Sequence, residues 1–232
     1  RILQYIAISG IVSLFYFSFG LTFLPEFLNT KLMLAVVGAG FATLHAIENR
    51  NVKIDKSLLM AFCFASVFSL VCLISVDYNQ TSDYSYASYV MSFLIWLFSA
   101  YAVCAIIKLE HGYVDIKLLT FYLMAVCVVQ CFLALLIDSN QAFQSLVNRY
   151  IAQDQDFLLE VKRLYGIGAS LDNAGVRFSV VLIMIASVLT QDLVFNKSYK
   201  QLIFVLLSFF FIVVVGNMIS RTTSLGAIFG LL

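Results

Sequence analysis

The sequence predicts an all-α, polytopic membrane protein: a bundle of transmembrane helices with one large external loop that contains an interfacial helix. Two observations lead to this prediction. Of the 232 residues, 62% are hydrophobic and only 12% are charged, and the mean hydropathy is +0.97, unlike the composition of soluble domains. The charged residues also cluster between apolar runs of roughly 15 to 23 residues, the length that a helix needs to cross about 30 Å of hydrocarbon.

The apolar runs predict seven complete spans and the start of an eighth within a single transmembrane domain, residues 1–232. The predicted spans are residues 2–24, 32–47, 58–76, 88–107, 117–137, 177–195 and 202–217, with the eighth running from Thr222 to Leu232. The eighth run is only half a span long, and the chain begins with Arg1 instead of Met. We therefore expect the sequence to be the N-terminal part of a longer protein.

The distribution of basic residues predicts a cytoplasmic N-terminus, because short loops rich in Lys and Arg stay inside. Short segments on one side of the predicted topology hold Arg1, Arg50, Lys53, Lys56, Lys108, Lys117, Lys197 and Lys200. Those on the other side hold only Lys31 and Arg221. The long loop, residues 138–176, is then external; its basic residues count less because long loops follow the rule poorly.

Composition also argues against several kinds of ligand. The net charge of +1 provides no basic field for nucleic acid. The five cysteines all lie in apolar runs and are interpreted as packing residues. Cys127 and Cys131 have a spacing compatible with metal binding, but no nearby His or second pair completes a site. We therefore expect no metal and no other cofactor.

The external loop opens with an amphipathic pattern. Its apolar residues fall on one helical stripe, with polar residues opposite: Phe143, Leu146, Val147, Tyr150 and Ile151. This pattern is typical of a helix that lies along the membrane surface. We expect this helix to form a lid or collar.

Three arginines are predicted to meet on the external side: Arg163 in the long loop, Arg177 at the mouth of the sixth span, and Arg221 between the last two spans. A guanidinium forms planar, bidentate hydrogen bonds with phosphate oxygens, so a bound anion would explain cations on this side. A lipid-linked phosphate or pyrophosphate is the expected ligand.

The same arginines also have ordinary structural explanations. Arg163 can pair with Glu160 or Asp172, Arg177 can reach lipid headgroups, and Arg221 can cap a helix end. Both alternatives remain open from the residues alone. A catalytic set is not apparent either, because His45 and His111 are predicted on the cytoplasmic side, away from the arginines.

Two short motifs resemble those of the O-antigen ligase and O-antigen polymerase superfamily of bacterial inner-membrane enzymes. Arg163-Leu164-Tyr165-Gly166, followed by Asn173-Ala174-Gly175, is similar to that family's pattern of an Arg, a nearby Gly and a later Asn before a span. Ser220-Arg221-Thr222-Thr223-Ser224-Leu225-Gly226-Ala227 is similar to its Ser-Arg-Gly signature at the start of a span, with Thr222 where Gly is usual. The many spans and the large external loop agree with the family's layout.

The resemblance implies a glycosyltransferase of the bacterial inner membrane, with its N-terminus in the cytoplasm. It would move glycan from a polyprenyl-pyrophosphate carrier to a glycan or lipid acceptor on the periplasmic face. Its matching arginines, Arg163 and Arg221, would bind the pyrophosphate. The predicted topology adds Arg177 to the same site, with Asn173 and Gly166 as supporting residues. The catalytic His is expected in a later external loop that these residues do not include.

The main alternative is a multi-span transporter or flippase of lipid-linked or small substrates. Such a protein is expected to place ionisable groups near the bilayer midplane or to break helices there. Nearly all charges lie at span ends instead, and Asp192 is the one acid within a span boundary. A structural or assembly subunit also remains possible and would need none of the arginines. The choice between ligase and polymerase stays open.

Overall fold

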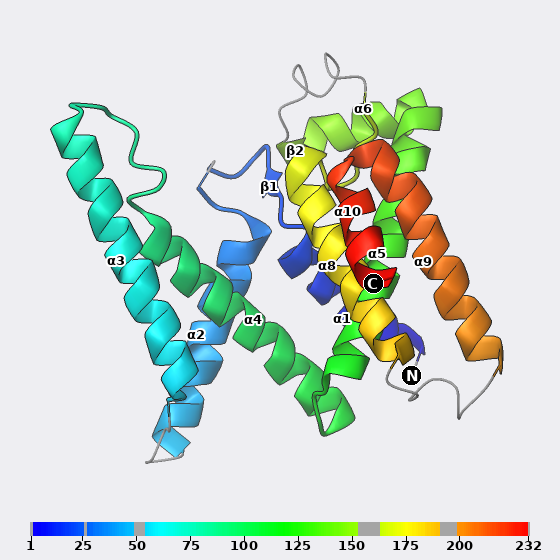
Figure 1. The fold of residues 1–232 in the computed structure, drawn as a ribbon, viewed down its shortest axis with the longest axis horizontal. Helices are drawn as coiled ribbons and strands as arrows, with labels where there is room; N and C mark the ends of the chain where they lie inside the picture. Colours follow the sequence, from blue (N-terminus) through cyan, green and yellow to red (C-terminus); the bar gives the residue numbers. More distant parts are fainter. Residues whose placement is uncertain (1, 26, 49–53, 153–162, 191–198, 232) are drawn as a thin grey trace. The chain divides into compact units, whose positions relative to one another are not determined.

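The computed structural model confirms the all-α fold class and describes residues 2–25, 27–48, 54–152, 163–190 and 199–231. Six helices in this part of the chain are long and apolar enough to cross a membrane: α2 (Thr30–Glu48), α3 (Lys56–Tyr78), α4 (Tyr89–His111), α5 (Ile116–Ser139), α8 (Leu171–Thr190) and α9 (Tyr199–Ile219). The shorter elements are α1 (Ile2–Tyr16), β1 (Gly20–Leu21), α6 (Gln141–Tyr150), β2 (Ile151–Ala152) and α10 (Thr222–Leu231). The protein is therefore a multi-pass membrane protein (Figure 1).

The chain divides into two compact units, whereas the sequence analysis predicted one domain. The first unit comprises Arg1–Thr30 with Ile107–Leu232, and the second comprises Lys31–Ile106. Within the second unit, α3 and α4 run antiparallel: the Phe68 ring lies 5.1 Å from that of Tyr89, and the Phe62 ring, earlier in α3, lies 6.3 Å from that of Phe93, later in α4. Apolarity along the chain cannot reveal such a division, because it measures affinity for lipid and not which helices pack together.

The spanning helices differ in how much protein surrounds them. Within the protein itself, 56% of the α5 span is buried, compared with 11% of the α3 span. Helix α5 contacts α1, α6, α8 and α9, and it forms the centre of the first unit. Helix α3 exposes large apolar side chains such as Phe64 and Leu70 around its circumference. Such a helix is stable only in an apolar solvent, which here is the bilayer.

The first predicted span, residues 2–24, is wrong in its length, because α1 ends at Tyr16. The Thr30 hydroxyl donates to the Leu14 carbonyl at 2.8 Å and accepts from the Phe19 amide at 3.2 Å, which satisfies groups at the helix end. The first apolar residue that follows, Phe17, is fully buried against protein, whereas Phe23 is 70% exposed. A side chain that packs against protein has the same hydropathy as one that faces lipid, so the sequence did not separate the two.

The sixth span also begins earlier than predicted, at Leu171 instead of residue 177. Asp172 and Asn173 are therefore in the first turn of α8 and not in the external loop. Their polarity resembles that of a loop, but an acidic residue in the first turn is favourable next to the helix dipole. The predicted loop, residues 138–176, thus shortens at both ends, since α5 continues to Ser139. The predicted end of this span, with Asp192, lies outside the described residues.

The helix expected in the external loop is α6, and it begins directly after α5. The Asn140 side chain accepts a hydrogen bond from the Phe143 amide at 3.1 Å and caps its first turn. Its apolar stripe is divided between two environments. Val147 is buried against Ile137 and Tyr165, whereas Leu146 is 54% exposed. Part of the stripe that was expected to face the membrane therefore faces the protein.

In the first unit, α1, α5 and α9 run in one direction, and α8 and α10 run in the other (Figure 1). The pairs that establish these directions are Tyr5 with Tyr122 and Ser13 with Gln130 for α1 and α5, Phe121 with Gln201 and Phe132 with Phe211 for α5 and α9, and Ser179 with Thr222 and Ala186 with Gly230 for α8 and α10. These directions are the ones that consecutive crossings require. We call the end at which α1, α5 and α9 finish and α8 and α10 begin the loop end.

Candidate functional site

Two short strands join the segment after α1 to the end of α6 at the loop end. Strands β1 and β2 are antiparallel, with Gly20 opposite Ala152 and Leu21 opposite Ile151. Thr22 extends this contact, because its amide donates to the Tyr150 carbonyl at 3.1 Å and its hydroxyl donates to the Arg149 carbonyl at 2.8 Å. The segment after α1 is thereby fixed to the end of α6.

The segment of residues 163–170, which we call the inner loop, enters the helix bundle and connects to α8. Leu164, Tyr165, Gly166 and Ala169 are all buried. The Tyr165 hydroxyl accepts from the Gln144 amide group and donates to the Asn148 side-chain oxygen, both at 3.2 Å. The inner loop is therefore attached to α6 at its start.

Glycine at position 168 gives the inner loop its tight path. Gly168 has a φ of +67°, a backbone conformation that residues with a Cβ rarely adopt. A Cβ at this position would also lie 2.6 Å from the Phe17 carbonyl oxygen and 2.9 Å from that of Ser18. The inner loop thus lies directly against the backbone that follows α1.

Arg177 lies within the bundle, in the second turn of α8. Its side chain is half-buried, and Nη1 donates to the Gly168 carbonyl at 3.4 Å. The guanidinium carbon lies 5.7 Å from the centroid of the Phe17 ring, within the range of a cation–π interaction. The Tyr16 hydroxyl donates to the Arg177 carbonyl at 2.8 Å. Arg177 therefore connects α1, α8 and the inner loop, whereas the sequence placed it at the mouth of the span.

Arg221 is exposed in the tight turn between α9 and α10. The adjacent Ser220 is fully buried, and its hydroxyl donates to the Asp172 carboxylate at 3.5 Å. Gly175 of α8 lies against the same serine, with room for no Cβ. These contacts place Arg221 beside the first two turns of α8.

Arg163 is half-buried at the start of the inner loop, two residues before Tyr165. All three predicted arginines thus lie at the loop end of the first unit. Gly166, a predicted supporting residue, packs against the Gln130 side chain. Asn173, the other one, is exposed in the first turn of α8. Glu160, the alternative partner of Arg163, lies outside the described residues.

Much of the second motif is used in helix packing. Gly226 of α10 lies against the backbone of Ser179 on α8, and Gly216 of α9 lies against Thr223. The Thr223 hydroxyl donates to the Gly216 carbonyl at 3.1 Å. Small residues allow membrane helices to approach closely. The small residues that follow Arg221 therefore have a structural explanation that Arg221 itself does not share.

Neither histidine belongs to the loop end. His111 is at the opposite end of the first unit, where its Nε2 is 2.8 Å from the Tyr122 hydroxyl and its ring lies 5.4 Å from that of Tyr5. His45 belongs to α2 in the second unit. Within the described residues, no group of three or more His, Cys, Asp or Glu side chains could hold a metal ion.

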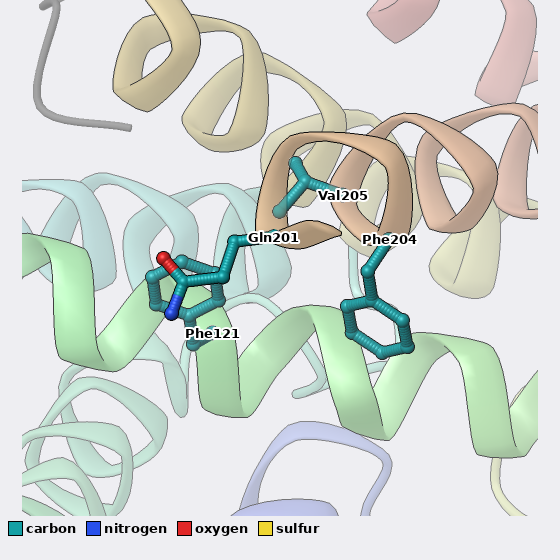
Figure 2. Close-up of a pocket in the computed structure, with 4 residues that line it drawn as sticks. All are labelled: Phe121, Gln201, Phe204 and Val205. Carbon is teal, nitrogen blue, oxygen red and sulfur yellow. The ribbon is translucent and has the colours of Figure 1, made fainter. Parts of the chain in front are cut away.

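Two grooves lie on the surface of the described residues, one in each unit. One of about 400 Å³ between α5 and α9 is lined by Phe121, Gln201, Phe204 and Val205, near the starts of both helices and far from the loop end (Figure 2). Another of about 480 Å³ lies between α3 and α4 in the second unit. Both are lined mainly by apolar side chains, as expected for surfaces that contact lipid chains.

Sequence reasoning missed the residues that support the loop end from within. Gln130 is 2% exposed in the middle of α5, and its Oε1 accepts from the Ile167 amide at 3.1 Å. Its signal in the sequence is that it is the single amide side chain in the apolar run of residues 117–137. Polar side chains inside a span usually have a structural or functional partner.

Comparison with known proteins gives no independent assignment of function to the loop end. No family model, no curated protein and no solved structure matches the chain. The resemblance to the O-antigen ligase and polymerase superfamily therefore depends on the two motifs at the loop end. The contacts described above are the basis for a proposal about function.

Proposed function

We propose that the loop end binds the pyrophosphate of a lipid-linked glycan, and that the protein is a glycan transferase of the O-antigen ligase or polymerase type. The observation that carries this proposal is the presence of Arg163, Arg177 and Arg221 at the same end of one packed unit. Positive charges gathered at one end of a membrane bundle attract an anionic ligand. Guanidinium groups suit phosphate oxygens because they donate in a planar fork.

The three arginines would have different tasks. Arg221 is exposed and Arg163 is half-buried, so these two side chains are suited to contact an incoming pyrophosphate. Arg177 is already bonded to the Gly168 carbonyl, and it would add positive charge beneath the ligand while it holds the inner loop. This arrangement would stabilise the negative charge that develops on the departing pyrophosphate.

In the proposed reaction, an acceptor hydroxyl attacks the anomeric carbon of the glycan. The bond between that carbon and the pyrophosphate oxygen breaks, and the pyrophosphate leaves with the bonding electrons. A general base must take the hydroxyl proton. The family resemblance assigns this role to a histidine in a later external loop, and no metal or nucleotide is required.

The location follows from the same proposal. The protein would be in the bacterial inner membrane with its N-terminus in the cytoplasm and its loop end at the periplasmic face. Its partners would be the bilayer, a polyprenyl-pyrophosphate-linked glycan, and a glycan or lipid acceptor. The basic residues near the starts of α3 and α5, Lys56 and Lys117, support this orientation.

Alanine substitution of the arginines tests the proposal. Removal of one charged partner from such a site costs about 2 to 5 kcal/mol, so Arg163→Ala and Arg221→Ala should abolish most glycan transfer in membranes supplied with lipid-linked glycan. Lysine at either position should restore little, because it offers a point charge. Arg149→Ala is the matched control, since Arg149 is an exposed arginine at the same end. Parental transfer rates in both alanine variants would refute the proposal.

A transporter or flippase is the second candidate, and one observation favours it. The inner loop is non-helical backbone buried inside a membrane bundle, directly before the start of α8. Transporters build substrate sites from such interruptions. Proteoliposomes that contain a fluorescent lipid pyrophosphate distinguish the two functions, because a flippase moves the lipid between leaflets without breaking a glycosidic bond.

A further inference from the structure

The inner loop reaches deep into the first unit. The Gln130 side chain accepts a hydrogen bond from the Ile167 amide, and Gln130 lies nine residues before the end of α5 at Ser139. At a rise of about 1.5 Å per residue, about 13 Å of α5 therefore extend beyond this contact toward the loop end. Gly166 lies even closer, since a Cβ there would come 2.6 Å from Gln130 Oε1. The base of the inner loop therefore lies beside the last turns of α5 and not above them.

The Gln130 side chain supplies a hydrogen-bond acceptor to the buried backbone of the inner loop. A non-helical backbone amide inside a membrane protein costs several kcal/mol if it finds no acceptor. The buried residues nearest to Gln130 on α5 are Val126, Cys127, Cys131 and Ala134, none of which has a side-chain carbonyl. Gln130 has the one buried side-chain carbonyl on α5, and its Nε2 lies 3.5 Å from the Ser13 hydroxyl of α1.

Two consecutive residues of the inner loop connect Gln130 to Arg177. The Ile167 amide is held by Gln130, and the next residue, Gly168, offers its carbonyl to Arg177. The Gly166 amide donates to the Ala169 carbonyl at 2.7 Å and closes this short turn. A displacement at Ile167 would therefore move the carbonyl that orients the Arg177 guanidinium.

We infer that Gln130 is a positioning residue: it holds the base of the inner loop, and through Gly168 it sets the position of Arg177 for an anionic ligand. The inference deepens the proposed function and rests on it for the identity of the ligand. Gln130 does not contact the ligand itself.

The test compares two substitutions at one position in the purified protein in lipid nanodiscs, titrated with a polyprenyl pyrophosphate. Gln130→Met keeps the length of the side chain and removes the carbonyl, so the ligand should bind roughly tenfold more weakly, as expected for one lost buried hydrogen bond. Gln130→Glu, neutral at this depth, keeps the carbonyl and should bind within about twofold of the parent. Gln201→Met is the matched control, because Gln201 lies near the start of α9, far from the loop end.

A second measurement reports on the inner loop without any ligand. In a variant whose five native cysteines are replaced, a thiol at Ala169, which is fully buried, should react with a water-soluble maleimide faster after Gln130→Met and at the parental rate after Gln130→Glu. A parent that fails to bind the lipid pyrophosphate defeats the proposed function, while the labelling rates still report on Gln130. If Gln130→Met alters neither labelling nor binding, or alters labelling alone while the parent binds, the positioning role is wrong. Should Gln130→Met fail to insert, Gly166→Ala disturbs the same contact.

Discussion

Gly226 of α10 lies so close to Ser179 of α8 that no side chain fits between the two helices. The Ser179 hydroxyl donates to the Thr222 carbonyl at 2.8 Å, one turn before Gly226. The first turn of α10 is thus fixed to α8 by a hydrogen bond and the second turn by backbone contact. Since Arg221 immediately precedes α10, this contact sets where the exposed arginine lies.

Gly226→Ala should therefore destabilise the first unit. A methyl group at this position overpacks a contact with backbone atoms that cannot rotate away, which typically costs about 1 to 3 kcal/mol. Gly10→Ala is the control, because a Cβ at Gly10 meets nothing within 4 Å. The measurement is the thermal unfolding midpoint in detergent. Equal midpoints for the two variants would show that α8 and α10 are not packed as described.

Gly168→Ala should also destabilise the protein, and for two separable reasons. The backbone conformation at φ +67° costs about 1 kcal/mol for a residue with a Cβ, and the added atom would also collide with the Phe17 carbonyl. Gly112→Ala has the same unfavourable backbone conformation, with φ at +77°, but no steric collision, since a Cβ there would meet nothing within 4 Å. Thermal midpoints should therefore fall further for Gly168→Ala. A larger loss for Gly112→Ala would contradict the buried position of the inner loop.

The divided stripe of α6 predicts unequal effects for neighbouring residues. Val147 is 2% exposed, so Val147→Ala should reduce the free energy of unfolding by about 1 to 2 kcal/mol through lost buried carbon groups. Leu146→Ala should change it by less than about 0.5 kcal/mol, as exposed positions usually do. Thermal unfolding of the two variants in the same detergent decides this point. A larger loss at Leu146 would mean that α6 turns its other face to the protein.

The basic residues predict which side of the membrane each end of α5 occupies. A cysteine at Lys108, in the last turn of α4, should be labelled from the cytoplasm, and one at Gln144 in α6 should be labelled from outside. The measurement uses a membrane-impermeant thiol reagent on intact and opened cells, in a variant without the five native cysteines. Labelling of Gln144 from the cytoplasm would place the loop end inside and rule out a periplasmic site. The same expectation applies to Gln153, which lies outside the described residues.

Length and hydropathy alone determined that the chain is a multi-pass helical membrane protein and located most of its spans. The predicted spans at residues 58–76 and 117–137 lie within α3 and α5, which extend two residues or fewer beyond them at each end. This success has a simple cause, because a bilayer requires about twenty apolar residues for each crossing wherever the helix packs. The amphipathic stripe likewise located α6, since a period of 3.6 is a local property.

The tertiary structure decided which apolar residues face protein and which polar residues belong to a helix. Residues 17–24 continue the apolar run of α1, yet Phe17 is buried and Leu21 is paired in a strand. Asp172 is polar, yet it begins α8, where its carboxylate accepts from Ser220. Both depend on partners more than forty residues away in sequence, and a hydropathy window does not include them.

For the candidate site, the sequence alone identified the residue types and the end of the bundle at which they gather: Arg163, Arg177 and Arg221. Only the tertiary structure showed that Arg177 is bonded to Gly168 and that Gln130 holds Ile167, the preceding residue of the same loop. Charged residues are informative one at a time, because a charge is costly at any position inside a membrane and is therefore expected at the ends of spans. Hydrogen-bond partners cannot be predicted from single residues, because Gln130 and Ile167 become neighbours only when the inner loop packs against α5.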